Sequence, residues 1–111
     1  MLPQDLRLPS IDIAPLMRHG KRVHEGGIDF IFRKTLKGKH FAFIVSTKID
    51  KHATGRNRIK RLLREATAAQ IPHVEDGVDG IMIVKGKTSD EYEKMKELIY
   101  RLLNAAGVIR V

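Results

Sequence analysis

The residues of this chain whose types and spacing could do chemistry are concentrated in GRNRIKRLLRE, residues 55–65. Five of these eleven residues are Arg or Lys, and Arg predominates, which suits bidentate hydrogen bonds to phosphate oxygens. Gly55 would let a nucleic-acid backbone approach the start of the segment closely. The candidate phosphate-binding residues, including the connector before the segment, are Lys48, Lys51, His52, Arg56, Asn57, Arg58, Lys60, Arg61 and Arg64.

The distribution of charge supports the same interpretation. The net charge of the 111 residues is +8. Residues 48–64 contain seven basic residues and one acidic residue, a net charge of +6, whereas residues 65–111 contain six basic and eight acidic residues, a net charge of −2. Such clustering is typical of a surface that binds a polyanion, and solubility alone would not require it.

A helix over residues 55–69, with Thr54 as its N-cap, would position these cations. The apolar residues of the segment recur at i, i+3, i+4 and i+7 and are Ile59, Leu62, Leu63 and Ala66. When this stripe faces a core, the basic side chains spread over the exposed side. Like charges four residues apart destabilise an isolated helix by about 0.2–0.5 kcal/mol per pair. We therefore expect an external anion to offset the repulsion.

The remaining segments predict an α+β fold in one domain, residues 1–111. A helix should run from Ser10, its N-cap, to Gly20, with Pro15 in its first turn. A half-buried strand at 28–34 and an apolar, central strand at 41–47 should be joined by a hairpin turn around Gly38. A third strand at 79–87 should precede a final helix, which a capping box at 88–91 opens and Gly107 ends. This order predicts a small two-layer α/β sandwich with helices packed on a sheet.

Other kinds of site find little support in the sequence. The chain has no cysteine, so it can form neither a disulfide nor a thiolate zinc site. Its five histidines lack paired metal spacing and are expected on the surface or in loops, and its carboxylates are too scattered for a two-metal nuclease. We therefore expect no catalytic residue, no metal site, no cofactor and no small-molecule substrate. Without a signal peptide or membrane span, a cytoplasmic location is expected.

The segment VSTKIDKHATGRNRIKRLLREA resembles the signature of the bacterial ribonuclease P protein subunit. In outline, that signature is a strand, a short connector and then Arg-Asn-Arg-x-x-Lys-Arg-x-x-Arg-Glu. Weaker similarity covers almost the whole chain, including LRLPSIDIAPLMRHGKR, VDGIMIVKGK and SDEYEKMKELIYRLL. The positions that meet the signature here are Arg56, Asn57, Arg58, Lys60, Arg61, Arg64 and Glu65.

The resemblance implies a mixed sheet with a left-handed βαβ crossover through the basic helix, against the usual right-handed rule. It also implies an accessory subunit of an endoribonuclease, in which a catalytic RNA removes 5′ leaders from precursor tRNA. In such an enzyme the protein binds the RNA subunit and the leader, and Mg²⁺ ions act at the active site of the RNA. The implied partners are therefore two RNA molecules.

The family holds the leader in a cleft between the N-terminal helix and the sheet. The candidate cleft residues here are Ile13, Met17, Ile31, Lys85 and Lys87. Aromatic residues are common in the family where this chain has Ile13 and Met17. Because stacking of a base on an aromatic ring contributes about 1–3 kcal/mol, we expect the leader to be held more weakly or in a different way.

Two other hypotheses use the same basic helix. A non-catalytic RNA-binding module of ribosomal-protein type would need the same cations. A helix that binds anionic membranes fits less well, because its apolar stripe lacks Trp and Phe and is needed by the core. We therefore expect no membrane partner.

Overall fold

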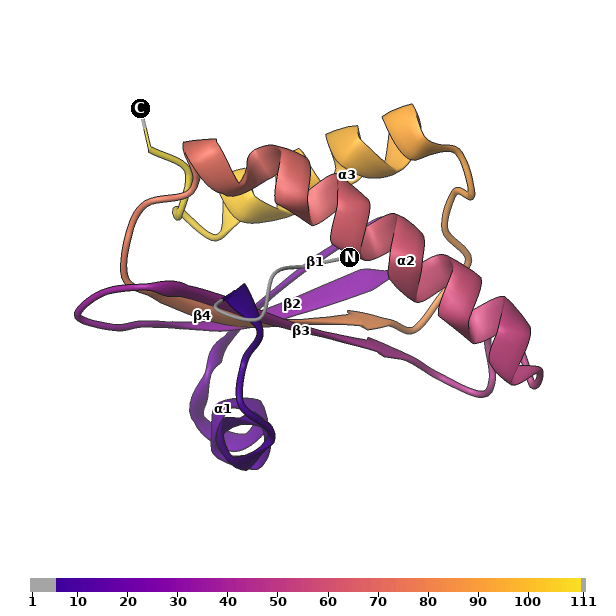
Figure 1. Ribbon diagram of the computed structural model, residues 1–111, viewed down its shortest axis with the longest axis horizontal. Coiled ribbons are helices and arrows are strands. Elements are labelled where there is room, and N and C mark those ends of the chain that lie inside the picture. Colours follow the sequence, from indigo (N-terminus) through magenta and orange to yellow (C-terminus); the bar gives the residue numbers. More distant parts are fainter. Residues whose placement is uncertain (1–5, 111) are drawn as a thin grey trace.

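The structure is a computed structural model, and it describes residues 6–110. A short N-terminal helix precedes three consecutive strands, and the fourth strand lies between two longer helices along the chain (Figure 1). The elements in order are the 3-10 helix η2 (Ser10–Asp12), α1 (Ile13–His19), β1 (Lys21–Glu25), β2 (Ile28–Lys34), β3 (Lys39–Val45), α2 (Ala53–Gln70), the 3-10 helix η3 (Ile71–His73), β4 (Val78–Val84) and α3 (Tyr92–Ala105).

The four strands form one mixed sheet in the order β1-β2-β4-β3. β2 pairs antiparallel with β1 and with β4, while β3 and β4 are parallel. The sequence prediction missed β1, which follows directly after Gly20, the predicted end of the N-terminal helix. β1 is a short edge strand with Val23 as its single apolar residue, so it has little hydrophobic pattern. The glycines of the β1–β2 turn, Gly26 and Gly27, both have positive φ.

Helices cover both faces of the sheet (Figure 1). α2 and α3 lie on one face over the larger apolar core, which includes Phe30, Met82 and Leu102. α1 lies against the opposite face, where Leu16, Ile31 and Ile81 form a second cluster. β2 is therefore buried on both faces, and the prediction of a half-buried strand was wrong. The predicted α+β class, with helices packed on a sheet, is confirmed.

The place of β3 also differs from the prediction. β3 is an edge strand, and β4 is central. β4 lies between β2 and β3, so the loop around Gly38 is not a hairpin turn. β3 is apolar because both of its faces pack against other apolar residues. Phe41 and Val45 face the larger core, and Ala42 and Ile44 pack against the second cluster. In Figure 1 the chain passes from β3 through α2, which lies in front of α3, and returns to β4 by a left-handed crossover.

The ends of the helices were predicted less well than their existence. Ser10 begins a 3-10 turn, and α1 itself begins at Ile13, which places Pro15 in its first turn as expected. α2 begins at Ala53 after His52, so Thr54 is not its N-cap. Glu91 precedes α3 without a side-chain cap, so the predicted capping box does not form. Gly107 has a φ of 74° and follows the end of α3, as predicted.

Candidate nucleic-acid interface

The burial of α2 confirms its predicted orientation. Leu63 and Ala66 have no exposed surface, and Ile59 and Leu62 are half-buried against the core. Arg58 and Arg61 are exposed, as is Asn57 between the basic positions. Arg56, Lys60 and Arg64 are half-buried along the other flank of the helix. α2 thus presents basic side chains on both flanks of its apolar stripe.

Most cations of α2 and of the connector before it lack an acidic partner among the residues that the structure describes. Among residues 6–110, no salt bridge joins an acidic side chain to any of the following six residues: Lys48, Lys51, Arg58, Lys60, Arg61 and Arg64. The cations of α3 differ, since Lys94, Lys96 and Arg101 each pair with a glutamate three or four residues away. Exposed helices usually interleave opposite charges in the way that α3 does. The unpaired surface of α2 therefore has the properties of an anion-binding site.

The connector between β3 and α2 is organised by Asp50. Its carboxylate accepts hydrogen bonds from the backbone amide of His52 at 2.8 Å and from His52 Nδ1 at 3.2 Å. The bond from the amide lowers the pKa of Asp50. Arg56 donates to the backbone carbonyl of Asp50 at 2.9 Å. A Cβ on Gly55 would collide with the Asp50 carboxylate, so the glycine makes room for this side chain rather than for a nucleic-acid backbone.

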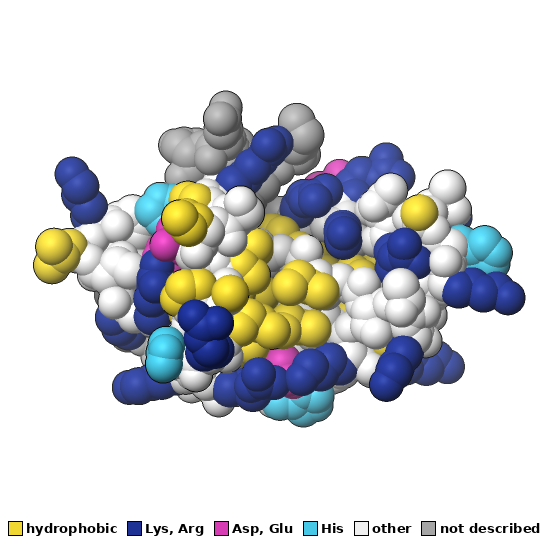
Figure 2. All heavy atoms as spheres, turned by 90° about the horizontal axis from the view of Figure 1, so that it is seen from below, with side chains coloured by type: hydrophobic (Ala, Val, Ile, Leu, Met, Phe, Trp, Pro, Cys, Tyr) yellow, Lys and Arg dark blue, Asp and Glu magenta, His cyan; other side chains and the backbone are white. Residues whose placement is uncertain are grey.

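A groove lies on the face of the sheet that α1 covers in part. We call it the sheet groove; it has a volume of about 390 Å³ and is lined by Met17, Ile44, Ser46, Lys48, Ile83 and Lys85. In Figure 2, which shows the molecule from below, apolar side chains fill the middle of this face and Lys and Arg surround them. An apolar floor with a basic rim suits a single-stranded nucleic acid, because its bases need apolar contact and its phosphates need cations.

The candidate cleft residues divide between several places. Met17 and Lys85 line the sheet groove. Ile31 is only 1% exposed and lies in the apolar cluster under α1, with Ile13 packed against the same cluster. Lys87 lines a neighbouring hollow, which shares Lys48 with the sheet groove.

The sequence prediction missed three residues of the sheet groove, Ile44, Ser46 and Ile83. Ile44 and Ile83 lie opposite each other in the parallel pairing of β3 and β4. Alternation of side chains along each strand places both residues on the same face of the sheet. This pattern could have predicted the groove only if β3 and β4 had been known to be neighbours.

Two buried carboxylates anchor cations on this face of the sheet. Asp29 lies at one end and contacts Arg22, His24 and Lys85 at 2.5–2.9 Å. Burial by itself raises the pKa of Asp29, but hydrogen bonds from its three partners outweigh this effect and lower the pKa to about 2. Lys85 is therefore held at the rim of the groove by a carboxylate that stays ionised.

Asp79 organises the other end of the face. Arg33 donates two hydrogen bonds to one carboxylate oxygen of Asp79, at 2.8 and 3.0 Å, and His40 Nδ1 lies 2.8 Å from the other oxygen. Arg33 also lies 3.6 Å from Asp12, the residue before α1. The hydrogen bonds to Asp79 raise the pKa of Arg33. This network ties the start of α1 to the sheet and so positions one wall of the groove.

His24 is exposed, as expected, and His40 is half-buried, and both lie in strands rather than in loops. His24 and His40 belong to β1 and β3 and contact Asp29 and Asp79. Within the described part of the chain, no three His, Cys, Asp or Glu side chains are grouped so that they could hold a metal ion. No helix between residues 6 and 110 has the length and hydropathy required to cross a membrane.

Comparisons with known proteins agree with this arrangement. The family model "Ribonuclease P" matches residues 2–107. The chain is 30% identical to the ribonuclease P protein component of Synechocystis sp., an alignment that covers 97% of this chain and 90% of the relative. It is 28% identical to the corresponding protein of Dictyoglomus turgidum, over 89% of this chain and 86% of the relative.

Solved structures show the same fold. The ribonuclease P protein of Staphylococcus aureus superposes with a TM-score of 0.81 at 21% identity, covering 95% of this chain and 98% of that protein. The Thermotoga maritima protein superposes with a TM-score of 0.78 at 23% identity, covering 89% and 96%. With the family match over residues 2–107, these likenesses show that the chain belongs to the family of bacterial ribonuclease P protein components, subunits of the endoribonuclease that processes the 5′ leaders of precursor tRNAs.

Proposed function

We propose that α2 and its connector bind the catalytic RNA of ribonuclease P, while the sheet groove binds the 5′ leader of the precursor tRNA. The observation that supports the first part is the set of basic side chains on α2 that have no acidic partner among residues 6–110. Bringing RNA phosphates to this surface would relieve the repulsion between these cations and release counterions from the RNA. The proposed contacts are made by Lys48, Lys51, His52, Arg56, Asn57, Arg58, Lys60, Arg61 and Arg64.

The sheet groove supports the second part of the proposal. Its floor of Met17, Ile44 and Ile83 gives apolar contact to unpaired bases, and Lys48 and Lys85 stand at its rim. The groove has no aromatic residue among its lining side chains. Bases would therefore pack on aliphatic side chains, and binding of the leader should depend little on which bases it contains.

The two surfaces together would allow the protein to assist cleavage without supplying a catalytic side chain. α2 would hold the protein on the RNA subunit, and the groove would hold a part of the substrate that mature tRNA lacks. Binding energy from this remote contact positions the scissile bond and favours precursor over product. The hydrolytic chemistry would belong to the RNA, which supplies Mg²⁺ at its own active site. Residues 1–111 would act as one domain, in the cytoplasm where bacterial precursor tRNAs are processed.

Precursor cleavage by a bacterial ribonuclease P RNA tests this function. At low Mg²⁺, addition of the protein should increase the rate of leader removal. The variant Arg58→Ala/Arg61→Ala should require more protein for the same gain, because its affinity for the RNA subunit is reduced. Ile44→Asp, which places a negative charge in the groove, should bind the RNA subunit normally but lose the preference for precursor over mature tRNA.

The exposed variant Glu93→Gln on α3 is the matched control and should behave as the wild type. Tight RNA binding without any gain in leader removal would contradict the proposal and favour a non-catalytic RNA-binding module. Equal precursor preference in wild type and Ile44→Asp would remove the groove from leader binding while leaving the role of α2 intact.

A further inference from the structure

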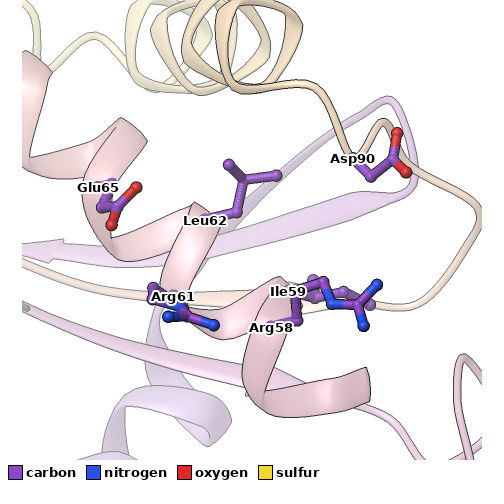
Figure 3. Close-up of a pocket in the computed structure, with 6 residues that line it drawn as sticks. All are labelled: Arg58, Ile59, Arg61, Leu62, Glu65 and Asp90. Atoms are coloured by element: carbon purple, nitrogen blue, oxygen red, sulfur yellow. The ribbon is translucent and has the colours of Figure 1, made fainter. Parts of the chain in front are cut away.

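A second hollow lies between α2 and the start of α3, on the side of the sheet opposite the sheet groove. We call it the helix hollow. It has a volume of about 330 Å³ and is lined by Arg58, Ile59, Arg61, Leu62, Glu65 and Asp90. Figure 3 shows Glu65 and Asp90 on opposite sides of Leu62, whose side chain points from α2 toward the start of α3. This volume is at the small end of ligand pockets, about 300–1,000 Å³, and suits a group the size of one nucleobase.

The charged side chains of the helix hollow are not paired with one another. Among the residues that the structure describes, no hydrogen bond or salt bridge joins Glu65 or Asp90 to any other side chain. Arg58 and Arg61 likewise have no acidic partner in this part of the chain. Glu65 is moreover the single acidic residue of α2. Two arginines and two carboxylates thus surround an apolar floor, and none of the four has a partner side chain among the described residues.

The carboxylates are the informative feature of this hollow. A surface that contacted only phosphate would be weakened by Glu65 and Asp90, because like charges repel. An ionised carboxylate can only accept hydrogen bonds, and its two oxygens match two adjacent N–H donors. RNA offers such donors on base edges, and the Watson–Crick edge of guanine has an imino N–H beside an amino group. Proteins read unpaired RNA bases in this way, by hydrogen bonds to exposed base edges.

We propose that the helix hollow binds one unpaired nucleobase with N–H donors, guanine foremost, from the catalytic RNA that α2 contacts. Its face lies against Ile59 and Leu62, a carboxylate of Glu65 or Asp90 accepts its N–H groups, and Arg58 and Arg61 contact the neighbouring phosphates. This inference rests on the proposed function, since it requires that α2 bind that RNA.

The surroundings of the helix hollow provide room for the adjacent nucleotides. A neighbouring hollow of about 330 Å³ shares Ile59 and Asp90 with it and is also lined by Lys48 and Lys87. A strand whose base enters the helix hollow can therefore continue past two further lysines. The proposed site combines an apolar floor, carboxylates with two acceptor oxygens each, and cations on both sides. A nucleotide in a single strand requires this combination.

Removal of a carboxylate tests the inference, because the two possible kinds of contact predict opposite changes in the affinity for the RNA. The variants are Glu65→Gln, Asp90→Asn and the double variant, and the probe is a bacterial ribonuclease P RNA. If α2 contacts phosphate alone, loss of negative charge raises the affinity for the RNA. If a carboxylate accepts base N–H groups, the affinity of the double variant falls by about tenfold, as expected for lost hydrogen bonds to a charged group. Glu93→Gln removes the same charge outside the hollow and serves as the matched control.

Chemical probing of the RNA identifies the base. A glyoxal reagent modifies the N1 and N2 positions of unpaired guanine, so a guanine in the hollow should be protected by the wild-type protein. The double variant should lose protection at that base while backbone protection elsewhere stays the same. An unchanged or increased affinity of the double variant, or a decrease without any base losing protection, overturns the inference. If the inference fails in this way but Arg58→Ala still weakens RNA binding, the proposed function of α2 is retained. If the wild-type protein itself does not bind the RNA, the proposed function is contradicted.

Discussion

Lys85 Nζ lies 2.9 Å from a carboxylate oxygen of Asp29, and this pair joins the rim of the sheet groove to the buried face of β2. Asp29 also contacts Arg22 and His24, so one carboxylate holds three basic side chains at this edge of the groove. The arrangement stabilises the fold and, at the same time, restrains a cation that the leader would need. Stability and RNA binding should therefore respond in opposite directions when Asp29 is changed.

The first prediction concerns stability against pH. The pKa of Asp29 is about 2 in the folded protein against an ordinary value of 3.8, so its ionised form favours folding. This contribution is fully present above about pH 4 and is lost as the pH falls toward 2, and it amounts to about 2 kcal/mol. Asp29→Asn should lower the free energy of unfolding by about this amount at pH 7, as measured by urea denaturation.

The deficit of Asp29→Asn should narrow between pH 4 and pH 2, where the wild-type carboxyl takes up its proton. Glu93→Gln, an exposed carboxylate on α3, should show no such pH-dependent deficit. A deficit of equal size at every pH would mean that the variant acts through packing rather than through charge.

The second prediction concerns leader binding by the same pair. Lys85→Ala should weaken the binding of precursor tRNA relative to mature tRNA by about two- to fivefold, which corresponds to about 0.5–1 kcal/mol for an exposed charge contact. Asp29→Asn should strengthen it by a similar factor, because it frees Lys85 and removes a negative charge beside the groove. Competition between the two tRNAs for the assembled enzyme measures this difference, and Lys96→Ala on α3 is the control. Weaker precursor binding in Asp29→Asn would contradict the proposed role of the pair.

The third prediction uses the missing aromatic residues of the groove. Met17 is 37% exposed and lines the groove, whereas Ile13 packs against the apolar cluster under α1. Met17→Phe should strengthen leader binding by about 1 kcal/mol or more, because a ring stacks on a base. Ile13→Phe should bring no such gain and should instead lower stability by about 1–3 kcal/mol through overpacking. Equal gains from both variants would show that the leader follows a different path across α1.

The fourth prediction concerns the salt dependence of RNA-subunit binding. Arg58→Ala and Arg61→Ala should each reduce the slope of log affinity against log salt by about one, as expected for one lost phosphate contact. Arg101→Ala is the matched control, since this arginine lies on α3 and pairs with Glu97. Titration of the RNA subunit at several salt concentrations measures the slopes. Slopes equal to that of the wild type would exclude these two residues from the interface.

Short-range patterns were enough to predict the basic helix. The spacing of Ile59, Leu63 and Ala66 determines which side of a helix faces the core, and the cations must then lie on the remaining surface. The end of α3 at Gly107 was predictable for a similar reason, because a positive φ favours glycine. The α+β class followed from the order of periodic segments. The N-caps were predicted less well. Several neighbouring residues near Thr54 and Glu91 could begin each helix, and the local sequence does not decide between them.

The sequence by itself thus determined the charge, orientation and approximate length of α2, since all three depend on residues within a few positions of one another. Only the tertiary structure decided that β4 separates β2 from β3, that β1 exists as an edge strand, and that Ile44 and Ile83 meet in a groove. The helix hollow needed it as well, because Glu65 and Asp90 are brought together by the packing of α2 against α3. Which distant segments come into contact depends on how all segments together bury their apolar side chains. A local sequence pattern contains no information about this arrangement.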